Sequence, residues 1–253
     1  MATVFITGAA KNTGLAIAYK FAENGFEVAI SSRNGEEAKK AATQISQNYN
    51  IRAKGYGLEL HDINGIRQVF HEIKEDFGGL DVFVPNAADL GVGQDILTVT
   101  EEEYDQVMNS NIKGTYFCCQ QAALIMKERQ KGSIVIIGSV HYKQAIWGRS
   151  LYAASKGALA SFTRSAAFEL GRHGIRINYI VAGAIKTNRW DTLTEDEIAK
   201  KRINWPLGLE STGEDIANGA FYLGTDLSKT VTGTDLTIDS GVGICLLPYN
   251  GGK

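Results

Sequence analysis

Two side chains with complementary proton chemistry, Tyr152 and Lys156, stand four positions apart in the sequence YAASK. If this segment is helical, both side chains lie on one helix face. A free phenol has a pKa near ~10, which is too high for efficient proton exchange near neutrality. An ammonium group beside the phenol favours the phenolate and lowers that pKa. The pair therefore predicts a general acid and base, although the same spacing also occurs in ordinary helices.

Two further polar residues precede this pair. Ser139 ends a predicted strand, and a hydroxyl at the carboxyl end of a strand lies on the ligand side of an open α/β sheet. Asn111 falls inside a predicted long helix, where asparagine is mildly unfavourable. Asn111 is therefore either a solvated polar position or a second functional group.

A glycine-containing loop, residues 7–14 with the sequence TGAAKNTG, follows the first predicted strand and opens the first helix. Glycine lets the backbone approach a pyrophosphate, which the helix N-terminus also attracts. The alternative is an ordinary turn between strand and helix. Asn12 replaces a further glycine, and asparagine tolerates a positive φ angle. The predicted pyrophosphate-binding residues are Gly8, Lys11, Asn12, Thr13 and Gly14.

The end of the second predicted strand, residues 30–34 with the sequence ISSRN, carries no acidic residue. An NAD site usually places an acid here to bind the ribose hydroxyls. Ser32 and Arg33, with Lys11 in the adjacent loop, would instead attract a 2′-phosphate. The sequence therefore predicts NADP in preference to NAD.

These residues must be positioned by a regular alternation of strands and helices. Continuous apolar runs such as 134–137 indicate strands buried on both faces. The predicted strands are Thr3–Thr7, Glu27–Ser31, Arg52–Leu58, Leu80–Pro85, Ser133–Ser139, Arg176–Val181 and Asp235–Ile238. The predicted helices are Thr13–Asn24, Glu36–Asn48, Asp62–Phe77, Glu101–Arg129, Leu151–His173 and Glu214–Thr225. This alternation predicts a doubly wound parallel α/β sheet of about seven strands with helices on both faces.

Residues 188–211 contain no clear strand, and their charged middle, Thr194–Arg202, favours a short helix. An insertion that follows a strand end is placed to act as a substrate lid. We find no linker or repeat, so one domain over residues 1–253 is the simplest organisation.

The net charge of −2 and the pI near 6.1 give no broad attraction for nucleic acid or an anionic membrane. Cys118, Cys119 and Cys245 cannot all pair within one chain and form no cluster of metal ligands, so we expect no metal. The N-terminus enters a strand without a basic region, and no apolar run reaches the ~20 residues of a membrane span. We therefore expect a soluble, cytoplasmic protein.

Together these motifs resemble the short-chain dehydrogenase/reductase family over nearly the whole chain. The loop at 7–14, Asn111, Ser139, Tyr152 and Lys156 carry most of the resemblance. Further matches are Arg176-Ile177-Asn178 running to Gly183 and Thr187, then Thr232-Gly233 and Asp239-Ser240-Gly241. The resemblance implies a single Rossmann-type domain that binds a nicotinamide cofactor.

The resemblance also implies a role for each matching residue. Tyr152 would be the acid and base, and Ser139 would bond the reacting oxygen. Lys156 would hold the nicotinamide ribose and lower the pKa of Tyr152, while Asn111 would hold a water that relays protons. The remaining cofactor contacts implied are Glu59 near the adenine, Asn86 with Ala87 near the adenosine ribose, and Gly183, Ile185 and Thr187 near the nicotinamide.

Four positions, in three motifs, depart from the family pattern. The family's Asn-Asn-Ala-Gly is replaced by Pro85-Asn86-Ala87-Ala88, so that one amide donor is lost and a methyl group is added. The usual Pro-Gly after the sixth strand is Ala182-Gly183, and the second loop glycine is Asn12. These changes bear on the affinity for the cofactor, whereas the four reacting residues are complete.

The predicted substrate pocket combines Ser139 with residues 140–149 and the lid. Local similarity around residues 139–141, 152–157 and 248–252 resembles the sugar dehydrogenase branch, such as glucose 1-dehydrogenase. The predicted substrate contacts are Ser139, His141, Gln144, Arg149 and Trp190, in which the imidazole and amide favour a polyhydroxy compound. Lys143, Arg149 and Arg189 raise the alternative of a substrate with an acidic tail. We expect a small polar ketone, aldehyde or sugar.

Two rival functions stay open on the sequence alone. One is reduction of a 3-oxoacyl thioester, and the other is a non-catalytic Rossmann module that senses NADP(H). A sensor does not need the phenol–ammonium pair, so replacing Tyr152 by phenylalanine would distinguish it from an enzyme. The family resemblance further suggests a homotetramer built on the helices Glu101–Arg129 and Leu151–His173.

Overall fold

The computed structural model describes residues 1–91, 93, 95–203 and 205–245. Its centre is one seven-stranded parallel sheet in the order β3-β2-β1-β4-β5-β6-β7, which confirms the predicted doubly wound architecture. The strands are β1 Thr3–Thr7, β2 Glu27–Ser32, β3 Ala53–Gly57, β4 Val82–Val84, β5 Gly132–Ile137, β6 Ile175–Ala182 and β7 Asp235–Ile238.

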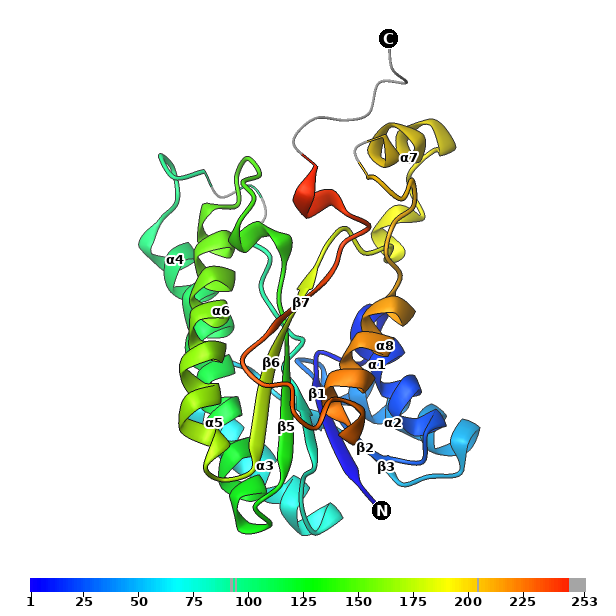
Figure 1. The fold of residues 1–253 in the computed structure, drawn as a ribbon, viewed down its shortest axis with the longest axis vertical. Helices are drawn as coiled ribbons and strands as arrows, with labels where there is room; N and C mark the ends of the chain where they lie inside the picture. Colours follow the sequence, from blue (N-terminus) through cyan, green and yellow to red (C-terminus); the bar gives the residue numbers. More distant parts are fainter. Residues whose placement is uncertain (92, 94, 204, 246–253) are drawn as a thin grey trace.

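Helices cover both faces of this sheet (Figure 1). They are α1 Asn12–Glu23, α2 Gly35–Tyr49, α3 Ile63–Phe77, α4 Glu101–Met108, α5 Thr115–Glu128, α6 Ser150–Gly171, α7 Glu195–Arg202 and α8 Gly213–Gly224. One face packs against α1, α2 and α8, and the other packs against α3, α5 and α6. Within the described residues, no helix is both long enough and apolar enough to cross a membrane.

The first strand shows why the sheet needs two covering layers. Val4, Phe5 and Ile6 are all fully buried. Phe5 points into one layer, where its ring packs on Phe70 and Phe83 at centroid distances of 5.2 and 5.4 Å, whereas Val4 and Ile6 point into the other. Continuous apolar strands therefore follow from burial on both faces, as predicted.

The predicted single helix over 101–129 is wrong in its middle. A π-helical segment, Asn109–Gly114, separates α4 from α5. Asn111 lies in this segment and is almost completely buried, and its side chain bonds both backbone groups of Asp89. Gly114 lies against Leu60, whose carbonyl oxygen would be 2.3 Å from an added Cβ. These contacts favour a wider turn, which hydrophobic periodicity does not reveal.

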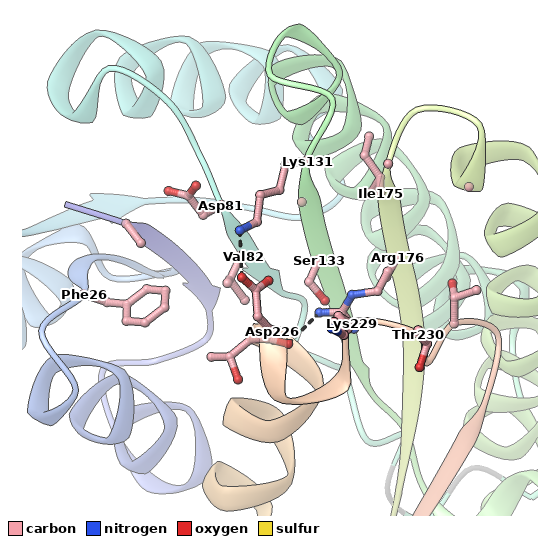
Figure 2. Close-up of a pocket in the computed structure, with 17 residues that line it drawn as sticks. Phe26, Asp81, Val82, Lys131, Ser133, Ile175, Arg176, Asp226, Lys229 and Thr230 are labelled. Carbon is pink, nitrogen blue, oxygen red and sulfur yellow. Dashed lines mark hydrogen bonds and ion pairs between the residues drawn. The ribbon is translucent and has the colours of Figure 1, made fainter.

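A cavity of about 610 Å³ lies at the amino ends of β4, β5 and β6, lined by residues that Figure 2 shows. Arg176 Nη1 donates to the carbonyl of Leu223 at 2.8 Å, and its Nη2 donates to that of Thr225 at 2.9 Å. Lys131 and Asp226 form an exposed ion pair at 3.0 Å across the same region. Arg176 therefore binds the carboxyl end of α8, where a cation is stabilising.

Candidate active site

The loop between β1 and α1 folds closely because its glycines leave room for neighbouring chain. Gly8 has φ +64°, and a Cβ there would be 2.9 Å from Cβ of Ala87. A Cβ on Gly14 would be 2.4 Å from the carbonyl oxygen of Gly8. Asn12 has φ +52°, so the predicted positive φ at this position is confirmed.

The segment after β4 is bonded directly to this loop. The side-chain amide of Asn86 donates to the carbonyls of Thr7 and Gly8, both at 3.0 Å. The hydroxyl of Thr7 accepts from the backbone N–H groups of Asn86 and Ala87 at 3.0 and 3.1 Å. The side chain of Asn86 therefore shapes the loop. The contact of Asn86 with the adenosine ribose, which the family resemblance implies, stays a prediction.

A cleft of about 1170 Å³ lies at the carboxyl ends of β1, β2 and β4. The predicted cofactor residues that line it are Gly8, Lys11, Asn12, Thr13, Gly14, Ser32, Arg33, Glu59, Asn86, Ala87 and Thr187. Tyr152, Lys156, Gly183 and Ile185, which are also predicted to bind the cofactor, lie outside this lining. Gly183 approaches Asp239, whose Cα would be 2.6 Å from an added Cβ, and Ile185 forms a bridge with Ser211.

Sequence reasoning missed one wall of the cleft. It is formed by His61, by Asp89 and by the polar residues Glu102, Asp105, Gln106, Asn109 and Ser110. The side-chain amide of Gln106 donates to the carboxylate of Asp89 at 2.8 Å, which ties α4 to the segment after β4. The sequence signal for this wall was the polar face of the predicted helix over 101–129, but such a face normally lies in solvent.

The cleft fits the phosphates of a dinucleotide. Lys11 occupies the N-cap position of α1, and its side chain makes no capping bond. The first N–H groups of α1 therefore lack a side-chain acceptor and can bind an anion at the positive end of the helix dipole. Residues 31–34 carry Ser32 and Arg33 but no carboxylate, and Glu37 joins the lining from α2.

The phenol–ammonium pair lies on one face of α6, as the spacing predicts. Tyr152 and Lys156 are buried, with 8% and 3% of their surfaces exposed. Lys156 Nζ lies 5.5 Å from the ring centre of Tyr152 and donates to the carbonyl of Ile137 at 2.9 Å. Burial lowers the pKa of Lys156 to about 8. At pH 7 about nine-tenths of this amine still carries its proton.

Ser139 follows β5 and begins a short 3-10 helix, Val140–Tyr142, so the predicted strand ends two residues early. Its hydroxyl oxygen accepts from the backbone N–H of His141 at 3.2 Å. The His141 ring lies 6.1 Å from the Tyr152 ring, centre to centre, with the planes nearly perpendicular. Burial, with a smaller contribution from Arg149, lowers the pKa of His141, so this imidazole is neutral at neutral pH.

Asn111 connects the π-helical segment to α6. Its Nδ2 donates to the Ser155 hydroxyl at 3.0 Å and to the carbonyl of Asp89 at 2.8 Å. Ser155 in turn donates to the carbonyl of Tyr152 at 2.8 Å. The side chain of Asn111 therefore fixes the turn of α6 that carries the phenol, while the relay role stays a prediction.

Three of the predicted substrate residues make contacts within the protein. Gln144 Nε2 donates to the carbonyl of Val242 at 3.0 Å, and Arg149 donates to that of Leu90 at 2.6 Å. Trp190 packs on Trp205 at a centroid distance of 5.8 Å. The predicted tail contact at 248–252 and the side chain of Arg189 lie outside the described residues.

The structure thus brings Ser139, Tyr152 and Lys156 together at the carboxyl edge of the sheet, with Asn111 bonded to the same helix. A buried phenol beside a buried amine and a hydroxyl can exchange a proton with a carbonyl oxygen. Among the described residues, no group of three or more His, Cys, Asp or Glu side chains is arranged to hold a metal ion.

The chain is similar over almost its whole length to known proteins. A family model described as enoyl-(acyl carrier protein) reductase matches residues 8–243. A 3-oxoacyl-(acyl-carrier-protein) reductase of Staphylococcus aureus is 28% identical, covering 95% of this chain and 97% of its own. A 3alpha-hydroxysteroid dehydrogenase of Mediterraneibacter gnavus is 32% identical, covering 92% and 94%. The structure of ElxO with NADP bound has a TM-score of 0.88 at 30% identity, covering 95% of this chain and 98% of that one.

The family match spans almost the whole sheet together with the reacting groups. Strands β2 to β7, the glycine loop from Gly8 onward and the Tyr152–Lys156 pair lie within the matched residues. On these grounds the chain belongs to the short-chain dehydrogenase/reductase family of oxidoreductases.

Proposed function

We propose that this protein is an NADP(H)-dependent oxidoreductase that interconverts a small polar ketone, aldehyde or sugar with its alcohol. The observation that carries the proposal is the buried amine of Lys156, 5.5 Å from the Tyr152 ring centre and bonded to the end of β5. Burying a lysine is costly, and such strongly perturbed groups concentrate at functional sites. A module that only senses the dinucleotide has no need for this arrangement.

The residues of the site divide the proton chemistry between them. When bound, the dinucleotide supplies or accepts the hydride. In reduction, Tyr152 gives its phenolic proton to the carbonyl oxygen of the substrate. Since Ser139 Oγ accepts from the His141 N–H, its own hydroxyl hydrogen can be donated to the same oxygen. The positive charge of Lys156 stabilises the phenolate that results.

The preference for NADP is supported by the charges at the end of β2. Ser32, Arg33 and Lys11 line the cleft, and a guanidinium makes charge-assisted bonds with a phosphate. We expect a higher kcat/KM with NADPH than with NADH. Replacing Arg33 by alanine should lower that ratio by about tenfold to a hundredfold, because a hydrogen bond to a charged group contributes roughly 1.5–3 kcal/mol. Arg172→Ala, at the exposed end of α6, is the matched control.

The polarity of the predicted substrate is supported by His141. Its neutral imidazole lies beside the Tyr152 ring and can both donate and accept a hydrogen bond. Arg149 is engaged with the carbonyl of Leu90, which weakens the case for an acidic tail. The local resemblance to sugar dehydrogenases supports the same class. We therefore favour an uncharged hydroxylated substrate.

A second candidate, reduction of a 3-oxoacyl thioester, is favoured by the acyl-carrier-protein reductases among the relatives. An absorbance assay of sugars, polyols, small ketones and a 3-oxoacyl thioester with both cofactors separates the two functions. Turnover of thioesters or steroids alone would refute the polar-substrate proposal. Tyr152→Phe should abolish turnover while NADPH binding, followed by fluorescence, persists. NADPH binding without turnover of any compound would instead favour the sensor.

We also propose a homotetramer and a substrate lid. The homotetramer is supported by large apolar side chains exposed on α5 and α6, where Leu124 and Phe168 are 54% and 91% exposed. The lid, residues 188–211, contains α7, and the contact between the Trp190 and Trp205 rings joins the segments before and after that helix. Figure 1 shows α7 beyond the carboxyl edge of the sheet, on the side of the proposed site.

A further inference from the structure

The hydroxyl group of one buried residue, Tyr179, bonds the backbones of two reacting residues, Ser139 and Lys156. Tyr179 lies in β6, and its side chain is fully buried. Its oxygen accepts from the backbone N–H of Ser139 at 3.3 Å and donates to the carbonyl of Lys156 at 3.1 Å. The same oxygen therefore contacts the segment that follows β5 and the middle of α6.

The ring of Tyr179 is held tightly on both sides. An added Cβ on Gly138 would be 1.9 Å from Cζ of Tyr179 and 2.3 Å from its hydroxyl oxygen, so only glycine leaves room for this ring. On another side the Tyr142 ring packs at a centroid distance of 5.6 Å. Tyr142 is itself fixed, because its hydroxyl donates to Asp235 Oδ2 at 2.7 Å. The Tyr179 hydroxyl consequently has little freedom to move.

Burial raises the pKa of Tyr179 well above that of a free phenol. The group therefore keeps its proton throughout the working range of pH and remains a donor to the Lys156 carbonyl. The Tyr179 side chain is fully buried and its hydroxyl is bonded to two backbone groups, so direct contact with the dinucleotide is not its role.

We infer that Tyr179 is a positioning residue, which sets the separation between Ser139 and Lys156 and thereby the geometry of proton transfer. In addition to the helical bonds of α6, two hydrogen bonds hold Lys156, since its Nζ donates to the Ile137 carbonyl and its backbone carbonyl accepts from Tyr179. Loss of the Tyr179 hydroxyl leaves only the first of these bonds. A misplacement of about 1 Å can slow a reaction by about a hundredfold. For its kinetic consequence, this inference rests on the proposed function.

The test compares Tyr179→Phe with Tyr56→Phe. Each variant removes one hydroxyl from a buried tyrosine of a strand, but Tyr56 lies in the edge strand β3, outside the lining of the cleft, and its hydroxyl donates to Asp76 Oδ2 at 2.7 Å. For Tyr179→Phe we expect kcat to fall by about tenfold to a hundredfold, with an unchanged KM for NADPH and a larger solvent deuterium isotope effect. We expect Tyr56→Phe to change none of these three quantities.

A second measurement does not depend on turnover. The pKa of Lys156, followed by carbon-13 NMR of labelled lysine in the cofactor-free protein, should rise above about 8 in Tyr179→Phe, because a loosened α6 admits water to the amine. Gly138→Ala, whose Cβ displaces the same ring, should raise it as well. An unchanged pKa in both variants would overturn the inference. If the pKa of Lys156 rises in both variants but the wild-type protein turns over no substrate, the proposed function is refuted and the positioning role of Tyr179 stands.

Discussion

The buried amine of Lys156 determines how the stability of the cofactor-free protein varies with pH. Burial lowers its pKa from 10.5 to about 8, so the folded state loses this proton at a lower pH than the unfolded chain. Between these values the unfolded state binds more protons, and the free energy of unfolding rises with pH. Below about pH 8 both states are protonated, and the folded state carries the full cost of the buried charge.

The magnitude follows from the size of this change. Each pKa unit corresponds to about 1.4 kcal/mol, so the whole effect is about 3 kcal/mol, of which about 2 kcal/mol falls between about pH 7 and about pH 9.5. Lys156→Met removes the amine and keeps an unbranched apolar stem. Relative to this variant, the wild-type protein should gain about 2 kcal/mol over that range. Loss of the bond to the Ile137 carbonyl adds an offset that does not depend on pH.

Urea unfolding followed by circular dichroism at one protein concentration measures this difference. Both proteins, with and without Lys156→Met, carry Tyr152→Phe, because the phenol titrates differently with and without the neighbouring amine. The remaining groups contribute equally to both proteins and cancel. Lys127→Met, which removes an exposed amine on α5, is the control and should leave the pH dependence of the wild type unchanged. If wild type and Lys156→Met respond identically to pH, Lys156 is hydrated and the reasoning from its burial is wrong.

Three further predictions concern the loop, the lid and the surface. Asn12→Gly should stabilise the protein by up to about 1 kcal/mol in thermal unfolding, because glycine tolerates the positive φ at this position better than asparagine; a destabilised variant would contradict this. Arg202 lowers the pKa of Glu210 through two bonds of 2.8 and 3.0 Å, so Arg202→Met should lower the free energy of unfolding at neutral pH, and progressively less as acid protonates Glu210. An equal loss in the free energy of unfolding at neutral and at acidic pH would exclude this ion pair as the cause. Phe168→Glu should shift sedimentation toward smaller species, and an unchanged sedimentation coefficient would remove this side chain from the interface.

Residues close together in the sequence were the most predictable part of the site. The four-residue spacing of Tyr152 and Lys156 requires only a helix to bring them together, and α6 supplies it. The turn from β1 into α1 follows from its own glycines and from Asn12. The strands were also predictable, because a short continuous apolar run is typical of a strand that is buried on both faces of a parallel sheet.

Contacts between distant segments could not be predicted in this way. Asn86 bonds Thr7, 79 positions earlier, and nothing in either segment alone indicates that bond. Tyr179 resembles any aromatic residue of a buried strand until Gly138 and Ser139 are placed beside it. The residue type of Gln144 predicts a substrate contact, whereas in the structure its side-chain amide donates to the carbonyl of Val242. A polar side chain shows its type in the sequence, but its partner depends on packing.

The π-helical segment makes the length of the chain critical at one place. Asn109–Gly114 holds one more residue per turn than an α-helix would, and Asn111 meets Asp89 and Ser155 only in that phase. Deleting a single residue here would restore ordinary winding and leave α4 and α5 nearly in phase, because the wide turn holds the extra residue. The wide turn that brings Asn111 to Asp89 and Ser155 would be lost. A homologue that lacks one residue in this stretch must therefore hold the helix that carries Tyr152 through contacts other than those of Asn111, or it must have lost proton transfer by this phenol.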